Sequence, residues 1–150
     1  MHLTIEPVSS HPSLLGTIAG WLWSEWGTPV NRGLYESLVS HSRGSDLPVI
    51  WVAFDKERPV GTVGLLRTDL LSRQEFTPWM AVLRVIPEYR GRGISLHLQE
   101  HALAMARQLG YREIWLYTKK TGFYEKSGWV YVEDDVDDHG DSVRIYRKDL

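Results

Sequence analysis

Cysteine is absent from this chain of 150 residues. Disulfide bonds, thiolate metal sites and cysteine nucleophiles are therefore excluded, and the composition gives no sign of an oxidising compartment. Long apolar runs are also missing, so we expect no membrane-spanning helix. The first residues, MHLTIEPVSS, lack the basic start and apolar run of a signal peptide. These features lead us to expect a cytoplasmic protein.

An excess of positive charge is also missing. The 17 basic and 19 acidic side chains leave a net charge of −2. General nucleic-acid binding needs a basic field, so we expect no nucleic-acid partner. The hydrophobic content of 43% and charged content of 24% are ordinary for a globular protein. We expect residues 1–150 to form one domain with a core of its own.

Periodicity along the chain predicts a mixed α/β architecture. Strand-like runs of apolar residues cover residues 3–8, 48–54, 59–66, 80–86, 113–117, 129–134 and 142–148. Helical spacing covers 13–26, with Ser13 as the N-cap, and also 33–42, 94–109 and 121–126. Gly61 and Gly64 indicate bulges or close backbone approach within their strand. The order β α α β β β α β α β β favours a mixed sheet flanked by helices, in the α/β or α+β class.

The stretch from Trp79 to Gly110 combines a strand, a basic glycine-rich loop and a long helix. The first N–H groups of a helix have no partner inside it and attract anions. Glycine lets the backbone approach a ligand closely, and arginine suits phosphate oxygens. The loop of Arg90, Gly91, Arg92 and Gly93, with the helix start that follows it, therefore predicts a phosphate-binding site.

Two segments make the chain resemble the GNAT superfamily of N-acetyltransferases. The family's motif Arg/Gln-x-x-Gly-x-Gly/Ala is matched by residues 90–95, where Ser95 replaces the last small residue. The later segment Phe123-Tyr124-Glu125-Lys126-Ser127-Gly128-Trp129 is similar to the family's FYEKxGF. Both segments occur in the family's order, and the order of elements matches along nearly the whole chain.

The resemblance implies a mostly antiparallel mixed sheet in which the fourth and fifth strands splay apart. It implies acetyl-CoA as co-substrate, no metal, and direct transfer of the acetyl group to a primary amine of a small molecule or amino-acid-like acceptor. The backbone of Leu83, Arg84 and Val85 would bind the pantetheine arm. The matched motif, which ends in Ile94 and Ser95, would bind the pyrophosphate. The N–H of Val85 would polarise the thioester carbonyl.

For catalysis, the resemblance suggests Tyr124 as the general acid that protonates the departing CoA thiolate. The alternative is a half-buried tyrosine that only packs. An amine nucleophile must be neutral, which calls for a base, and Glu25, Asp69 and Glu88 are the candidates. Glu25, Trp26 and Asp69 are the residues that we expect near the acceptor.

Arg84 is unusual because a charge within a central strand needs a partner or a ligand. It either faces the carboxylate of an acceptor or forms an ion pair with a Glu or Asp side chain, for which Asp69 is a candidate. Trp21, Trp23 and Trp26 supply packing area. We assign Trp26 to the core and leave open whether Trp23 lines the acceptor site.

Two other readings belong to different classes of protein. His97, Glu100 and His101 match H-x-x-E-H, a zinc metallohydrolase motif, but a third metal ligand is not apparent, and surface histidines explain the pattern. A non-catalytic acyl-CoA-binding sensor would keep the fold and lose the turnover. The acidic run at 133–141 does not follow the EF-hand pattern and reads as a solvated hairpin tip. Dimerisation stays open.

Overall fold

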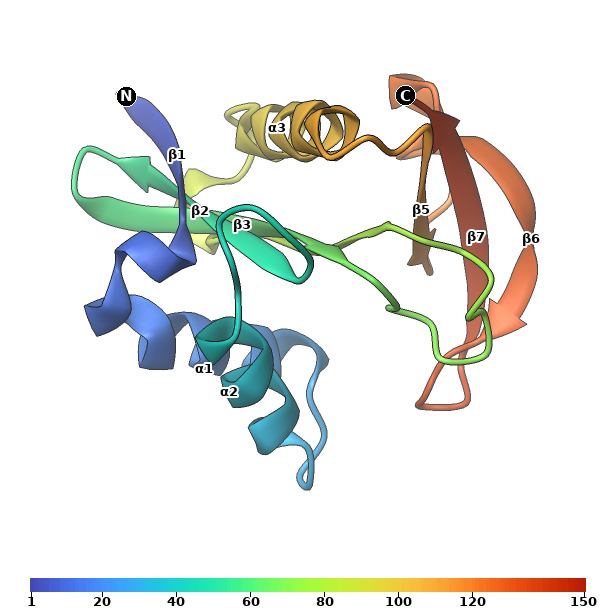
Figure 1. The fold of residues 1–150 in the computed structure, drawn as a ribbon, viewed down its shortest axis with the longest axis horizontal. Helices are drawn as coiled ribbons and strands as arrows, with labels where there is room; N and C mark the ends of the chain where they lie inside the picture. The colour runs from blue at the N-terminus through green and yellow to red at the C-terminus, as the bar shows by residue number, and fades with distance from the viewer.

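A computed structural model describes all 150 residues, and its centre is a seven-stranded sheet (Figure 1). The strands lie in the order β1-β2-β3-β4-β5-β7-β6. All neighbouring strands are antiparallel except β4 and β5, which are parallel. Their bounds are β1 Leu3–Pro7, β2 Val49–Asp55, β3 Arg58–Leu66, β4 Trp79–Val85, β5 Glu113–Thr118, β6 Val130–Val136 and β7 Ser142–Asp149. The expected mixed, mostly antiparallel sheet is thereby confirmed.

Helices cover both faces of this sheet. Helices α1 (Leu15–Trp26) and α2 (Arg32–Ser40) lie on one face, and α3 (Ile94–Gln108) lies on the other (Figure 1). None of the three combines the length and the apolar character needed to cross a bilayer. The predicted order of elements is confirmed, although the last helical segment is only a 3₁₀ turn, η4 (Glu125–Ser127).

The start of α1 differs from the prediction. A 3₁₀ turn, η2 (Pro12–Leu14), precedes the helix, and Leu14 is the N-cap residue without a side-chain hydrogen bond. The prediction that Ser13 caps the helix is therefore wrong. Proline favours the first position of a helical turn because its φ is fixed and it has no N–H to satisfy. Pro12 takes that position, which places Ser13 inside the turn.

The core is continuous on one face of the sheet and divided on the other. On the α3 side, one cluster of 17 buried residues includes Trp51 of β2, Leu98 of α3, and Leu116 of β5. On the opposite side, a cluster of 8 residues lies under α1 and α2. A separate cluster there contains Trp79, Trp115 and three further buried residues, Leu70, Val143 and Ile145.

A β-bulge in β4 separates it from β5. Thr62 pairs with Arg84 and Gly64 with Ala81, so two residues of β4 oppose one residue of β3. Val82, within the bulge, has φ of 49°, which is rare for a β-branched residue. The Thr62 hydroxyl donates a hydrogen bond to the Val82 carbonyl at 2.7 Å. Bulges bend a strand, and β4 and β5 pair only at Trp79 and Trp115. The expected splay is therefore present.

Two glycines of β3 make room for this bulged strand. A Cβ on Gly61 would lie 2.8 Å from the Arg84 carbonyl oxygen, and one on Gly64 would lie 2.9 Å from the Val82 side chain. Both distances are too short for a real Cβ contact. The predicted close backbone approach at Gly61 and Gly64 is confirmed.

Candidate active site

The glycine-rich loop leads from β4 into an uncapped helix start. Gly91 and Gly93 have φ of 76° and 79°, in the left-handed region that favours glycine. Gly93 is the N-cap of α3, and no side chain caps the helix there. The first N–H groups of α3 can therefore serve an anion. A cavity of about 100 Å³ lies at this point, lined by Val85, Tyr89, Arg90, Gly91, Gly93, Ile94 and Ser95.

The two loop arginines take different directions. The Arg90 Nε donates a hydrogen bond to the Val85 carbonyl at 3.1 Å, which places its guanidinium along β4. Arg92 folds back, with its guanidinium 4.6 Å from the centre of the Tyr89 ring and Nη2 3.2 Å from the Glu88 carbonyl oxygen. Arg90 lines the cavity at the start of α3, and Arg92 does not.

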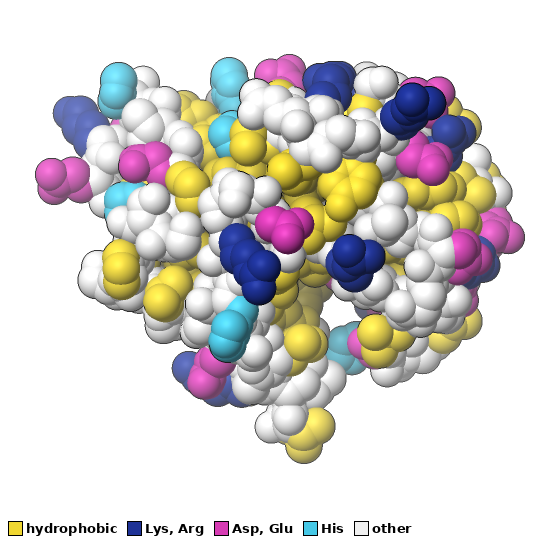
Figure 2. Space-filling view, in the orientation of Figure 1, with side chains coloured by type: hydrophobic (Ala, Val, Ile, Leu, Met, Phe, Trp, Pro, Cys, Tyr) yellow, Lys and Arg dark blue, Asp and Glu magenta, His cyan; other side chains and the backbone are white.

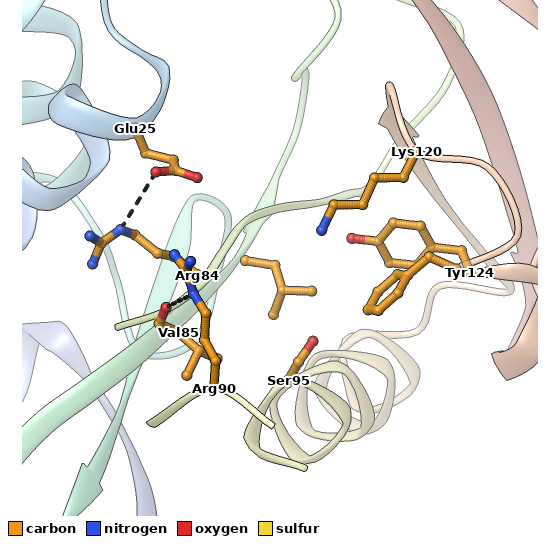
Figure 3. A pocket seen from close by; sticks show the side chains of 9 residues that line it. Glu25, Arg84, Val85, Arg90, Ser95, Lys120 and Tyr124 are labelled. Atoms are coloured by element: carbon orange, nitrogen blue, oxygen red, sulfur yellow. Dashed lines mark hydrogen bonds and ion pairs between the residues drawn. The ribbon is translucent and has the colours of Figure 1, made fainter. Parts of the chain in front are cut away.

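A larger cavity of about 320 Å³, called the central cavity below, lies where β4 and β5 splay apart (Figure 3). It adjoins the cavity at the start of α3, since both are lined by Val85, Arg90 and Ser95. Its other lining residues are Glu25, Leu83, Arg84, Lys120, Phe123 and Tyr124. The structure thus brings together residues from the end of α1, from β4, from the start of α3 and from the segment after β5.

Tyr124 points its hydroxyl into the central cavity (Figure 3). Its ring packs edge-on against Phe123 and Trp129, with centroid distances of 4.8 and 6.2 Å. Burial raises the pKa of Tyr124 to about 12. The hydroxyl therefore keeps its proton at neutral pH, and no residue of the chain accepts a hydrogen bond from it. That proton is available to a ligand.

The turn that carries Tyr124 is held from both sides. The backbone N–H groups of Ser127 and Trp129 donate to the Tyr124 carbonyl at 3.0 and 3.3 Å. The Tyr146 hydroxyl of β7 donates to the Glu125 carboxylate at 2.9 Å. Gly128 ends the turn with φ of 86°. A network that begins in the sheet therefore fixes the position of the Tyr124 ring.

Arg84 and Glu25 connect β4 with the end of α1. The Arg84 Nε lies 4.0 Å from a Glu25 carboxylate oxygen, and its guanidinium lies 5.3 Å from the centre of the Trp21 ring. The Arg84 side chain is 15% exposed, and the Glu25 side chain is 44% exposed. The alternative of an ion pair with a Glu or Asp is therefore present, but the partner is Glu25 and not the candidate Asp69. The bulge turns Arg84 toward α1, where Glu25 is the carboxylate within ion-pair distance.

The other expected acceptor residues lie outside the central cavity. Trp26 packs against the cluster under α1 and α2, as its core assignment predicted. Trp23 donates its indole N–H to the Thr28 carbonyl at 2.8 Å. Asp69 lies in the β3–β4 connection, where burial and the nearby charge of Asp138 raise its pKa to about 7. Glu88 is exposed and pairs with Arg58 at 3.5 Å.

The two histidines of the H-x-x-E-H pattern have different surroundings, so the expectation of two surface histidines is wrong for His101. His97 is exposed on α3, whereas the His101 ring packs edge-on against Trp51 at a centroid distance of 5.0 Å. No three His, Asp or Glu side chains of the chain form a group that could hold a metal. Asp137 and Asp141 of the acidic segment pair with Lys119 at the tip of the β6–β7 hairpin.

Lys120 and Phe123 were not among the predicted site residues, yet both line the central cavity. Phe123 belongs to the segment that resembles FYEKxGF, so that segment could have indicated it. Lys120 follows β5, and its position depends on how that strand ends beside the splay. No local pattern indicates such a position.

Charged side chains of both signs are interspersed on the face shown in Figure 2. That face is also hollowed between the side formed by α1 and α2 and the side formed by β6 and β7. This distribution agrees with the small net charge of −2, which gives no extended basic field.

The fold and the loop before α3 define the class of protein, and comparisons with known proteins agree. The family model described as "Acetyltransferase (GNAT) family" matches residues 15–129. The chain therefore belongs to the GNAT acetyltransferase family.

Relatives with curated names are similar to part of the chain. Human N-acetyltransferase 8B is 37% identical over 84 residues, which is 53% of this chain and 37% of that protein. Peptidyl-lysine N-acetyltransferase YjaB of Salmonella typhimurium is 37% identical over 93 residues, which is 61% of this chain and 57% of that protein. The matched part is thus between 37% and 57% of the length of these two relatives.

One solved structure shows the similarity of the whole fold. The structure of Arabidopsis thaliana NAA60 in complex with acetyl-CoA has a TM-score of 0.74 and 15% sequence identity, and the similarity covers 99% of each chain. At this identity the similarity concerns the fold alone.

Proposed function

We propose that the protein is an acetyl-CoA-dependent N-acetyltransferase acting by direct transfer on a primary amine of a small-molecule or amino-acid-like acceptor. The observation that carries this proposal is the junction of the two cavities at Val85, Arg90 and Ser95. A ligand that is anionic at one end and reactive at the other would place its phosphates at the start of α3 and its reactive group near Tyr124. Family membership supports this assignment.

The residues present fit acetyl-CoA. Its phosphates would be held by the uncapped N–H groups of α3, by the backbone of Gly91 and Gly93, and by Arg90. The thioester of acetyl-CoA supplies the activated acetyl group. The part of β4 beyond Trp79 has no pairing with β5, so its backbone there is free to hydrogen-bond an extended ligand.

Glu25 is the candidate acceptor of the amine proton. Its carboxylate is the acidic group of the cavity wall, and it is 44% exposed and only loosely paired with Arg84. A carboxylate at this place attracts an ammonium group and can take up a proton as the nitrogen becomes nucleophilic. Asp69 and Glu88 are less suited because neither lines the cavity.

Tyr124 is the candidate donor to the leaving sulfur. A phenol with a pKa of about 12 is a weaker acid than a thiol, whose ordinary pKa is about 8.5. Complete transfer of its proton to a free thiolate is therefore uphill. Tyr124 would donate a hydrogen bond while the C–S bond breaks, and would release its proton only as it regains one from the acetylated nitrogen, which is then far more acidic.

The first test measures binding and turnover separately. Calorimetry with acetyl-CoA comes first, and thiol release is then followed with a panel of diamines, amino acids and a lysine-containing peptide. The peptide is included because the Salmonella relative is named for a peptidyl-lysine acceptor. Absence of acetyl-CoA binding would remove the basis of the proposal, and binding without turnover on any amine would favour the non-catalytic sensor.

The residue roles are tested with Tyr124→Phe and Glu25→Gln. We expect each substitution to lower kcat by about 10²-fold, which is the lower end of the typical contribution of a general acid or base. Binding of acetyl-CoA should be retained. Tyr131→Phe is the matched control, since the Tyr131 hydroxyl donates to Asp134 at 3.0 Å and does not line the cavity. An unchanged kcat in Tyr124→Phe would show that Tyr124 only packs.

A further inference from the structure

A lysine amine lies inside the cavity that holds the candidate reacting groups. Lys120 lines the central cavity with Tyr124, Ser95 and Val85. Figure 3 shows its Nζ pointing into the cavity, toward the hydroxyl of Tyr124. The Lys120 N–H donates to the Thr118 hydroxyl at 3.0 Å, which fixes the turn after β5. The backbone therefore directs this side chain toward the site.

Lys120 has no carboxylate partner, unlike the neighbouring Lys119. The Lys119 Nζ lies 2.6 Å from Asp141 and 3.9 Å from Asp137, on the β6–β7 hairpin. Lys120 takes part in none of the ion pairs of the chain, and its Nζ lies 4.9 Å from the centre of the Phe123 ring. A cation over an aromatic face is held more weakly than one paired with carboxylates. No carboxylate therefore holds the Lys120 side chain away from the cavity.

We propose that Lys120 is a site of self-acetylation, in which the chain uses its own acetyl-CoA in place of an external amine. This inference rests on the proposed function, because it needs the thioester to bind beside Tyr124. Self-acetylation would add a modification site to the proposed function. It would also show that the cavity accepts a lysine side chain as acceptor.

The reaction balances without a further reagent. The Lys120 ammonium first releases one proton to water, which reaches this exposed residue. The neutral Nζ then attacks the acetyl carbonyl carbon, an N–C bond forms, and the C–S bond of the thioester breaks. The proton lost by the nitrogen ends on the CoA sulfur, so the products are acetyl-Lys120 and CoA with a free thiol. Tyr124 would donate to the leaving sulfur here as it does for an external amine. The same reacting groups then serve both acceptors.

Acetylation of Lys120 would change the cavity. The side chain would lose its positive charge and would place an acetamide in a space of about 320 Å³. We expect the acetylated enzyme to turn over external amines at least several-fold more slowly than the unmodified enzyme. The modification would therefore limit activity when acetyl-CoA is abundant and acceptor is scarce.

The test incubates the full chain with acetyl-CoA without acceptor and follows the intact mass and the acetylated peptides over time. We expect acetylation at Lys120 at least about 10-fold faster than at the other lysines, with a first-order rate that does not depend on protein concentration. Lys120→Arg should abolish this fast phase, Lys119→Arg should preserve it, and Tyr124→Phe should slow it about 10-fold or more. The urea-unfolded chain gives the rate of uncatalysed chemical acetylation.

Three results would overturn the inference: acetylation of Lys120 no faster than that of Lys126, an equal rate in the unfolded chain, or a fast phase that survives in Lys120→Arg. Calorimetry with acetyl-CoA distinguishes the two levels of the proposal. If acetyl-CoA binds and external amines are acetylated while Lys120 stays unmodified, only self-acetylation fails. If acetyl-CoA does not bind, the proposed function fails with it.

Discussion

Replacing Asp69 by asparagine should change how the stability of the protein depends on pH. Burial, with the charge of Asp138, raises the pKa of Asp69 from an ordinary 3.8 to about 7 in the folded chain. The folded state therefore binds this proton more tightly than the unfolded state. The resulting stability is complete below about pH 4 and is lost as the pH rises through about 7.

The size of this effect follows from the two pKa values. At about 1.4 kcal/mol per pKa unit, the difference corresponds to roughly 4 kcal/mol. Water still reaches part of the Asp69 side chain, which reduces the effect. We expect the wild-type chain to lose roughly 2–4 kcal/mol from this group between about pH 4 and pH 8. Asp69→Asn cannot ionise, so it lacks this loss.

Urea unfolding at a series of pH values measures the free energy of unfolding of wild type and Asp69→Asn, and the 7 tryptophans provide the fluorescence signal. The difference in the free energy of unfolding, Asp69→Asn minus wild type, should increase by roughly 2–4 kcal/mol from about pH 4 to pH 8. Asp46→Asn is the control, because Asp46 is an exposed carboxylate in a loose pair with Arg43 at 3.9 Å. Equal pH dependence in wild type and Asp69→Asn would refute the assignment of a buried, protonated carboxyl.

Two further predictions concern the β3–β4 contact and α3. Gly61→Ala places a Cβ 2.8 Å from the Arg84 carbonyl oxygen, so we expect about 1–3 kcal/mol of destabilisation and weaker acetyl-CoA binding by calorimetry. Gly33→Ala, which meets open space, should leave binding unchanged, and equal binding in both variants would contradict this account. Burial lowers the pKa of His101, so its stability contribution is present above about pH 6.5 and is lost as the pH falls. In thermal melts, the melting temperature of His101→Phe should therefore fall less than that of wild type as the pH drops below about 6.5. An equal fall in both proteins would contradict this assignment of His101.

The local parts of the fold and site were predictable because their signals lie in short stretches of sequence. The loop at residues 90–95, the strand before it and the close approach at Gly61 all follow from residue type and spacing. The splay of β4 from β5 was implied by the family resemblance. The residues themselves indicated the bulge at Val82 only indirectly, through the glycines of the facing strand, since no glycine lies in β4 itself. The Ser13 cap failed because Pro12 competes for the same turn.

Contacts between distant segments were not predictable in this way. The pairing of Arg84 with Glu25 joins residues 59 positions apart in the chain, and it depends on the direction in which the bulge turns β4. Lys120 reaches the cavity because β5 pairs with β4 only at Trp115 and then diverges. Each of these depends on tertiary geometry that composition and periodicity do not contain.

The splay between β4 and β5 determines how the two halves of the sheet are held together. The half made of β1 to β4 is joined to the half made of β5 to β7 by the Trp79–Trp115 pairing and by the apolar layer beneath α3. On the other face, the cluster that contains Trp79 and Trp115 joins the halves, and Arg73 of the β3–β4 connection pairs with Glu133 and Asp135 of β6. Past Trp79 and Trp115, β4 and β5 share no pairing. A ligand between β4 and β5 would bridge them, so its arrival should slow amide hydrogen exchange in β5 and β7 as well as in the residues that touch it.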